Sequence, residues 1–143
     1  MDKVKLAVPL KPDVVFIEFG TNDAYLPYKI SLQDSKKNLN TIIDTLRAAN
    51  PKAEIILQTM NSCKDKAAPS ATTRPQMAAY FQGYKDVARE RFLLVVDNYP
   101  AWLKLMTEDP ATFDRLVPDG LHPQPDGNRQ VLLPVLKKTL LGS

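Results

Sequence analysis

Residues 13–23 read DVVFIEFGTND, and this stretch decides the fold that the sequence predicts. Residues 14–19 form a nearly continuous apolar run, broken only by Glu18, that is rich in β-branched and aromatic side chains and is stopped by Gly20. Such a run is typical of a strand buried in a parallel sheet. Because ligands of open α/β sheets bind beyond the carboxyl ends of the strands, Gly20, Asn22 and Asp23 are expected where a site would form. The same residue types also favour an ordinary turn, so both interpretations stay open at this point.

Residues 119–123 read DGLHP and contain the only histidine of the chain, His122, three residues after Asp119. Catalysis by a hydroxyl nucleophile needs a base that takes the hydroxyl proton and an acid that orients the base. His122 and Asp119 are candidates for these two roles. A surface turn, with Asp119 and Gly120 as its turn pair, is the alternative.

Together the two blocks resemble the SGNH or GDSL hydrolase family of serine esterases and lipases. In that family a GxND block follows the third strand, and the resemblance implies that Asn22 is an oxyanion-hole donor within a binding block that includes Gly20 and Asp23. A DxxH block precedes the last helix and completes the catalytic triad, which implies those roles for Asp119 and His122. The resemblance also implies the family's flavodoxin-like fold, a three-layer α/β/α sandwich around a parallel sheet, with no cofactor.

The sequence departs from the family at the nucleophile. The family begins with a strand that ends in a Gly-Asp-Ser block, and none of the five glycines here belongs to a Gly-Asp-Ser or Gly-x-Ser sequence. We therefore expect residues 1–143 to form a single SGNH-like domain that is incomplete at its N-terminus. Ser62 and Cys63 are local alternatives for the nucleophile, but neither has the flanking glycines of a strained elbow.

Strands alternate with helices after the first block, which predicts an α/β fold. Ser31 and Asp34 resemble a capping box and start a helix that ends at Asn50. Two further strands are predicted at residues 54–59 and 92–97, which read EIILQT and FLLVVD.

The remaining segments are a loop and a final helix. Residues 60–75 have no apolar period and predict a surface loop at the same edge of the sheet as Asn22, with a substrate-facing role as the alternative. Pro125 suits the first turn of the last helix, residues 128–140 supply its apolar face, and Pro134 predicts a kink within it.

Composition excludes several classes of protein. The net charge is +3 and the basic residues are scattered, so we expect no nucleic-acid partner. The single cysteine, Cys63, allows no internal disulfide, and no apolar run is long enough for a membrane span. One histidine and scattered carboxylates form no recognisable metal-ligand set, so no metal is expected.

The partners expected from the resemblance follow from the missing first strand. In the family that strand lies beside the third, so residues 14–19 would have an unpaired edge and an uncovered apolar face, and such edges recruit other strands. The chain is therefore expected to form a homo-oligomer or to dock a complementing N-terminal segment that carries the serine. Its substrate would be a small-molecule, lipid or carbohydrate ester. A non-catalytic α/β module, a self-assembling fragment and one half of a split esterase are the alternatives.

Overall fold

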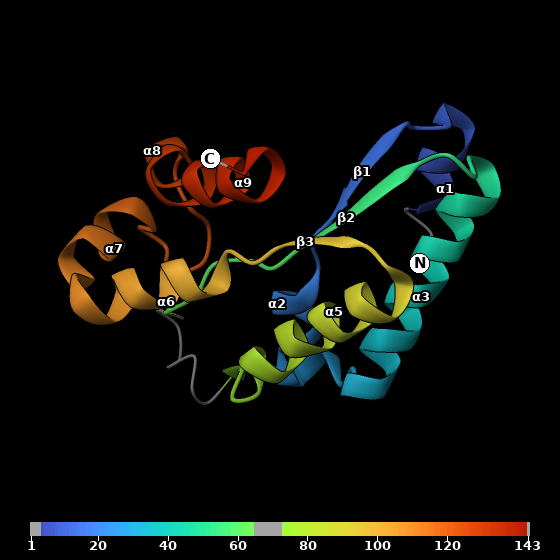
Figure 1. The fold of residues 1–143 in the computed structure, drawn as a ribbon. Coiled ribbons are helices and arrows are strands. Elements are labelled where there is room, and N and C mark those ends of the chain that lie inside the picture. The colour runs from blue at the N-terminus through green and yellow to red at the C-terminus, as the bar shows by residue number, and fades with distance from the viewer. Residues whose placement is uncertain (1–3, 65–72, 143) are drawn as a thin grey trace.

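The computed structural model describes residues 4–64 and 73–142 of the chain. Its sheet is parallel, with the strands in the order β1-β2-β3, and Figure 1 shows α3 and α5 on one face of the sheet and α9 on the other. The strands are β1 (Val14–Ile17), β2 (Glu54–Gln58) and β3 (Leu94–Val96). The predicted α/β class and the parallel sheet are confirmed.

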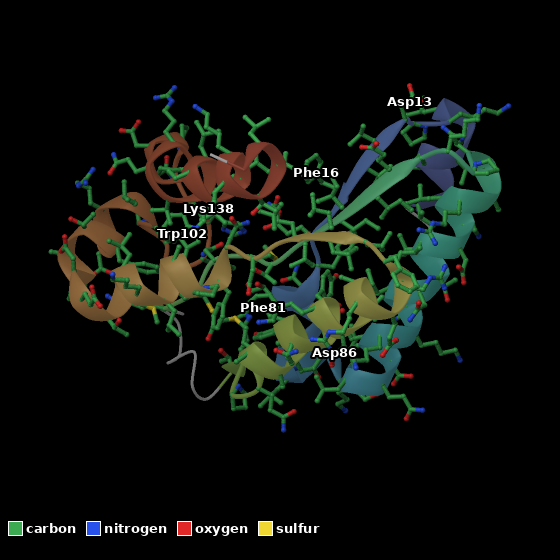
Figure 2. The ribbon with its side chains drawn as sticks, in the orientation of Figure 1. Asp13, Phe16, Phe81, Asp86, Trp102 and Lys138 are labelled. Atoms are coloured by element: carbon green, nitrogen blue, oxygen red, sulfur yellow. The ribbon has the colours of Figure 1, made fainter. Side chains whose placement is uncertain are left out.

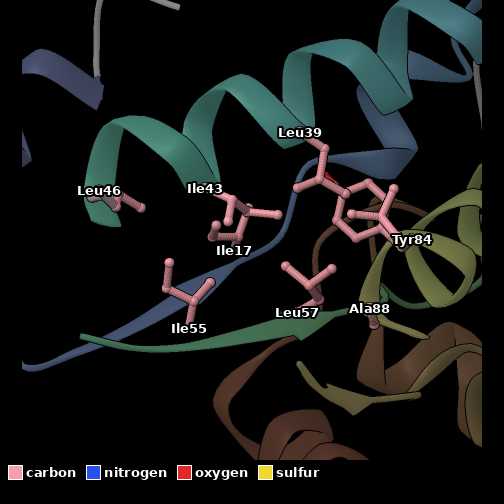
Figure 3. Packing of buried hydrophobic residues seen from close by; sticks show 9 residues of the cluster. Ile17, Leu39, Ile43, Leu46, Ile55, Leu57, Tyr84 and Ala88 are labelled. Atoms are coloured by element: carbon pink, nitrogen blue, oxygen red, sulfur yellow. The ribbon is translucent and has the colours of Figure 1, made fainter. Parts of the chain in front are cut away.

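The helix predicted after the first block is α3 (Leu32–Ala49). It begins as expected, because the hydroxyl of Ser31 accepts a hydrogen bond from the backbone N–H of Asp34 at 3.0 Å. Its buried face and that of α5 (Met77–Arg91) pack on the sheet, as Figure 3 shows. The cluster consists of Ile17, Leu39, Ile43, Leu46, Ile55, Leu57, Tyr84, Val87 and Ala88. Each fully buried aliphatic side chain of this kind contributes about 1.5–3 kcal/mol.

The predicted end of the first strand and the predicted start of the third strand are wrong, because the residues there belong to the ends of neighbouring helices. Phe19 leaves the first strand and precedes α2 (Gly20–Asp23) as its N-cap. Phe92 ends α5 in the left-handed region, with φ of 53°, and is 95% exposed. Its N–H bonds to the last carbonyls of α5, so it cannot take part in the ladder of β3.

The C-terminal part of the chain is helical and has its own buried cluster. Trp102, Phe113, Leu116 and Val117 form this cluster between successive helices. The elements are α6 (Tyr99–Glu108), α7 (Pro110–Leu116), α8 (Pro125–Gly127), the π-helical segment η3 (Asn128–Leu132) and α9 (Leu133–Leu141). Among the described residues, no helix is both long and apolar enough to cross a lipid bilayer.

A kink is predicted at Pro134, and there the last helix changes from the π-helical segment η3 to α9. Proline has no N–H to donate, so the regular hydrogen-bond pattern cannot pass through it. The apolar residues of this helix are only partly covered: no residue of α9 is buried, and Leu133 and Leu140 are 38% and 40% exposed.

The edge and one face of β1 are open. Within the described residues β1 pairs with β2 alone, and Val14 and Phe16 are 50% and 46% exposed. Figure 2 shows Phe16 on the side of β1 that faces α9, as strand alternation requires when Ile17 points into the core. On the other side a groove of about 650 Å³ lies between β1, α3 and α1 (Val4–Ala7). An unpaired edge and an exposed face are expected of this strand from the sequence, and among the described residues β1 has both.

Candidate active site

The DGLHP loop lies between α7 and α8 and is organised around the carboxylate of Asp119. One oxygen lies 2.6 Å from Nδ1 of His122, and the other accepts the backbone N–H groups of Leu121 at 2.8 Å and His122 at 2.7 Å. These bonds, the backbone N–H of His122 first, hold the pKa of Asp119 well below its usual range. A carboxylate only accepts, so the shared proton lies on Nδ1 and Nε2 is left to exchange a proton with a substrate or nucleophile.

Gly120 fastens this loop to the segment after β2. Its φ is 79°, its carbonyl accepts the N–H of Lys64 at 2.8 Å, and a Cβ built on it would lie 1.6 Å from the carbonyl oxygen of Lys64. The side-chain amide of Asn61 donates to the carbonyl of Leu121 at 3.0 Å and adds a second link. The position of His122 therefore depends on a close backbone approach that only glycine permits.

The first predicted block forms α2, directly after β1. Gly20 is buried and packs closely against Phe81: a Cβ built on Gly20 would lie 2.8 Å from the phenylalanine ring. Asp23 accepts the hydroxyl of Ser35 at 2.6 Å, which joins α2 to the first turn of α3. Asn22 is exposed, and its backbone N–H donates to Phe19 at 3.2 Å. Within the described residues no hydrogen bond joins Asn22 to the DGLHP loop, so its proposed role rests on its place at the end of β1.

Arg74 supports α2 and was missed by sequence reasoning. Its side chain is 7% exposed, and its Nε donates to the carbonyl of Thr21 at 3.1 Å. The guanidinium also lies 4.5 Å from the ring centre of Tyr25. An arginine in a stretch without periodicity gives no sequence signal for such a contact. Of the predicted loop 60–75, residues 65–72 lie outside the described part of the chain.

A pocket of about 220 Å³ opens beside His122. Residues after the carboxyl ends of all three strands line it, among them Glu18, Asn61 and Asn98, and Trp102 of α6 adds an aromatic wall. Burial raises the pKa of Glu18, although a hydrogen bond from Gln58 at 3.0 Å opposes the rise. Sequence reasoning did not single out these three residues, although their positions after strand ends are the signal that could have found them.

The alternative nucleophiles do not reach this pocket. Ser62 is 0% exposed and Cys63 is 1% exposed, and neither lines the pocket beside His122. The thiol of Cys63 lies 3.7 Å from the sulfur of Met77, within a buried apolar cluster. Burial in apolar surroundings leaves a thiol unreactive. The burial of Ser62 and Cys63 therefore argues against either residue as the nucleophile.

Comparison with known proteins establishes the family. The sequence profile of the GDSL-like lipase/acylhydrolase family matches residues 2–130, and the chain belongs to this family. No curated protein matches the sequence.

Solved structures of the same family have the same fold. A putative GDSL-like lipase from Parabacteroides merdae superposes with a TM-score of 0.80 at 19% identity, over 96% of this chain and 66% of that one. A catalytic mutant of Axe2, an acetylxylan esterase from Geobacillus stearothermophilus, superposes with a TM-score of 0.71 at 25% identity, over 96% of this chain and 66% of that one. The lipase/acylhydrolase from Enterococcus faecalis superposes with a TM-score of 0.69 at 29% identity, over 96% of this chain and 69% of that one. The chain thus spans about two-thirds of the length of these proteins.

Proposed function

We propose that this chain supplies the base, its orienting acid and one oxyanion donor of a serine ester hydrolase. The observation that carries the proposal is the pair formed by Asp119 and His122, 2.6 Å apart and beside an open pocket. Membership of the GDSL-like family supports the reaction class.

In this mechanism His122 takes the proton of a serine hydroxyl at Nε2 while the serine oxygen bonds to the ester carbonyl carbon. The amide of Asn22 donates to the negative oxygen that forms, and Asp119 stabilises the imidazolium. The proton then passes to the departing alcohol oxygen as its bond to carbon breaks. Water attacks the acyl-serine by the same route, which releases the acid and restores the serine.

The serine itself is assigned to a segment that docks along β1. Of the described serines, Ser31 caps α3, Ser35 bonds to Asp23 and Ser62 is buried. The open edge of β1 offers unpaired backbone groups to which an added strand can bond, and mostly apolar side chains line the groove of about 650 Å³ beside it. The acetylxylan esterase is longer than this chain, which covers 66% of its length. We propose that an apolar strand that ends in Gly-Asp-Ser occupies the open edge of β1.

The test is hydrolysis of 4-nitrophenyl acetate by the chain with and without an added N-terminal family segment that carries Gly-Asp-Ser. Acetate is the acyl group indicated by the name of the acetylxylan esterase. Activity should appear with the segment and fall by roughly 10⁴-fold or more in His122→Ala. Asn22→Ala should lower kcat by about 10²–10³-fold, whereas the exposed control Gln33→Ala should not change it. Activity that survives His122→Ala would refute the proposal, and a stable symmetric dimer that excludes the segment would identify a second copy as the occupant.

A further inference from the structure

The short helix α2 is fixed to its surroundings on both sides of Asn22. Gly20 packs against the ring of Phe81, where a Cβ built on the glycine would lie 2.8 Å from the ring. The carboxylate of Asp23 accepts the hydroxyl of Ser35 at 2.6 Å. The side chain of Asn22 is exposed and makes no hydrogen bond within the described residues. Its amide is therefore open to a ligand, and the backbone of α2 sets where that amide lies.

Arg74 holds the backbone directly before Asn22. The carbonyl of Thr21 receives a hydrogen bond from Nε of Arg74 at 3.1 Å. The N–H of Tyr25, which would bond to this carbonyl in a longer helix, bonds to the carbonyl of Asn22 instead. Carbonyl groups at the end of a helix need partners from outside it, and hydrogen bonds from a charged donor are the stronger kind. Arg74 thus anchors the last turn of α2.

The same guanidinium contacts the chain after Asn22. Its central carbon lies 4.5 Å from the centre of the Tyr25 ring, which is within the range of a cation–π interaction. Arg74 is 7% exposed, so water screens neither contact strongly. Thr21 precedes Asn22 by one residue and Tyr25 follows it by three. One side chain therefore holds the segment on both sides of the amide.

The contacts of Arg74 depend on the shape of its side chain as well as on its charge. The guanidinium is planar, so it can donate from Nε to Thr21 while it lies against the ring of Tyr25, and a lysine ammonium cannot do both in this way. Precise placement matters for an oxyanion donor, which acts only if it is held in position before the charge develops. A misplacement of about 1 Å can cost roughly a hundredfold in rate.

We propose that Arg74 is a positioning residue for ester hydrolysis, which acts through Asn22 and does not itself contact the substrate. By holding Thr21 and Tyr25, it keeps the amide of Asn22 aimed at the oxygen that becomes negative when the serine attacks. The assignment rests on the proposed function, in which Asn22 is the oxyanion donor.

A double-mutant cycle tests this role in the chain complemented with the Gly-Asp-Ser segment, with 4-nitrophenyl acetate as substrate. Arg74→Lys should lower kcat by about tenfold and leave KM nearly unchanged, because a contact made in the transition state is weakened. Arg89→Lys, the same substitution at a side chain that is 75% exposed, should not change kcat. In an Asn22→Ala background Arg74→Lys should have little further effect. Equal losses of kcat in both backgrounds would indicate a merely structural role and overturn the proposal.

Hydrogen exchange followed by NMR tests the positioning without any reaction. In the chain alone, Arg74→Lys should speed exchange of the backbone amides of Asn22 and Tyr25 by about tenfold, because a hydrogen bond that holds α2 is lost. The amide of His122, which donates to Asp119 at 2.7 Å, should keep its rate. Unchanged exchange at Asn22, or faster exchange throughout the chain, would overturn the proposal.

A second variant and the two readouts keep the outcomes separate. Tyr25→Leu removes the aromatic ring and leaves Arg74 in place, so it should cause a smaller effect in the same direction, and it serves if Arg74→Lys fails to fold. A complemented chain without any hydrolysis would refute the proposed reaction, and hydrogen exchange would still decide whether Arg74 positions Asn22. An active complex in which both folded variants keep the wild-type kcat would overturn the role of Arg74 alone.

Discussion

Replacing Gly120 with alanine should displace the DGLHP loop and destabilise the protein. A Cβ at this position would lie 1.6 Å from the carbonyl oxygen of Lys64 and 2.8 Å from its carbonyl carbon. These are backbone atoms, so no side-chain rotation relieves the clash. The loop must move away from Lys64, and His122 must move with it.

The magnitude follows from two terms. An alanine held at a φ of 79° costs about 1–2 kcal/mol, because its Cβ crowds the carbonyl oxygen in the left-handed region. Loss of the hydrogen bond from Lys64 to Gly120 adds about 1 kcal/mol. The free energy of unfolding should therefore fall by about 2–3 kcal/mol, which corresponds to a Tm roughly 10 °C lower for a chain of this size.

The assay is thermal and denaturant unfolding of Gly120→Ala beside Gly142→Ala. Gly142 is a matched control, because its φ is 70° and a Cβ there meets nothing within 4 Å. Gly142→Ala should carry the backbone strain alone, at the end of the chain, and cost about 1 kcal/mol or less. Equal losses in the two variants would refute the argument that contact with Lys64 holds the loop.

Three further changes test other parts of the structure. The pKa of Asp119 is lowered in the fold, so its stabilisation is present above about pH 4 and lost as the pH falls through the lower folded value. The stability difference between wild type and Asp119→Asn should thus shrink in acid, and a difference constant with pH in denaturant titrations would contradict this. Gly20→Ala places a Cβ 2.8 Å from the ring of Phe81 and should cost about 1–3 kcal/mol in thermal unfolding; no loss would mean that the ring shifts freely. Phe16→Lys, at a side chain 46% exposed, should cost under about 1 kcal/mol and reduce self-association in light scattering, whereas a wild-type chain that is already monodisperse would contradict it.

Much of the fold could be predicted from local patterns, because they coincide with the long-range packing. The cap at Ser31 and the apolar period after it predict α3 nearly to the residue. Phe92 shows where local patterns fail. Phenylalanine favours strands, but the end of α5 places this residue in the left-handed region. The exposure of α9 is a second limit, since an apolar stripe indicates which face can be buried but not whether a partner covers it.

Some residues of the candidate site could be predicted from the sequence and others could not. Asp119 and His122 are close in sequence, so their spacing predicts the contact that the structure contains. Asn98 and Glu18 meet His122 only through the arrangement of the strands, and no local pattern distinguishes them from turn residues. Arg74 reaches α2 across more than fifty residues, which no sequence period encodes.

The most direct test of the central claim is to locate the reactive serine with a fluorophosphonate probe and intact mass spectrometry. We expect that the chain alone is not labelled. An added segment with Gly-Asp-Ser should be labelled at its serine only when the chain is present, and far more slowly with His122→Ala. Labelling of this chain by itself, at Ser62 or at any other serine, would show that the nucleophile lies within these 143 residues and would contradict the account.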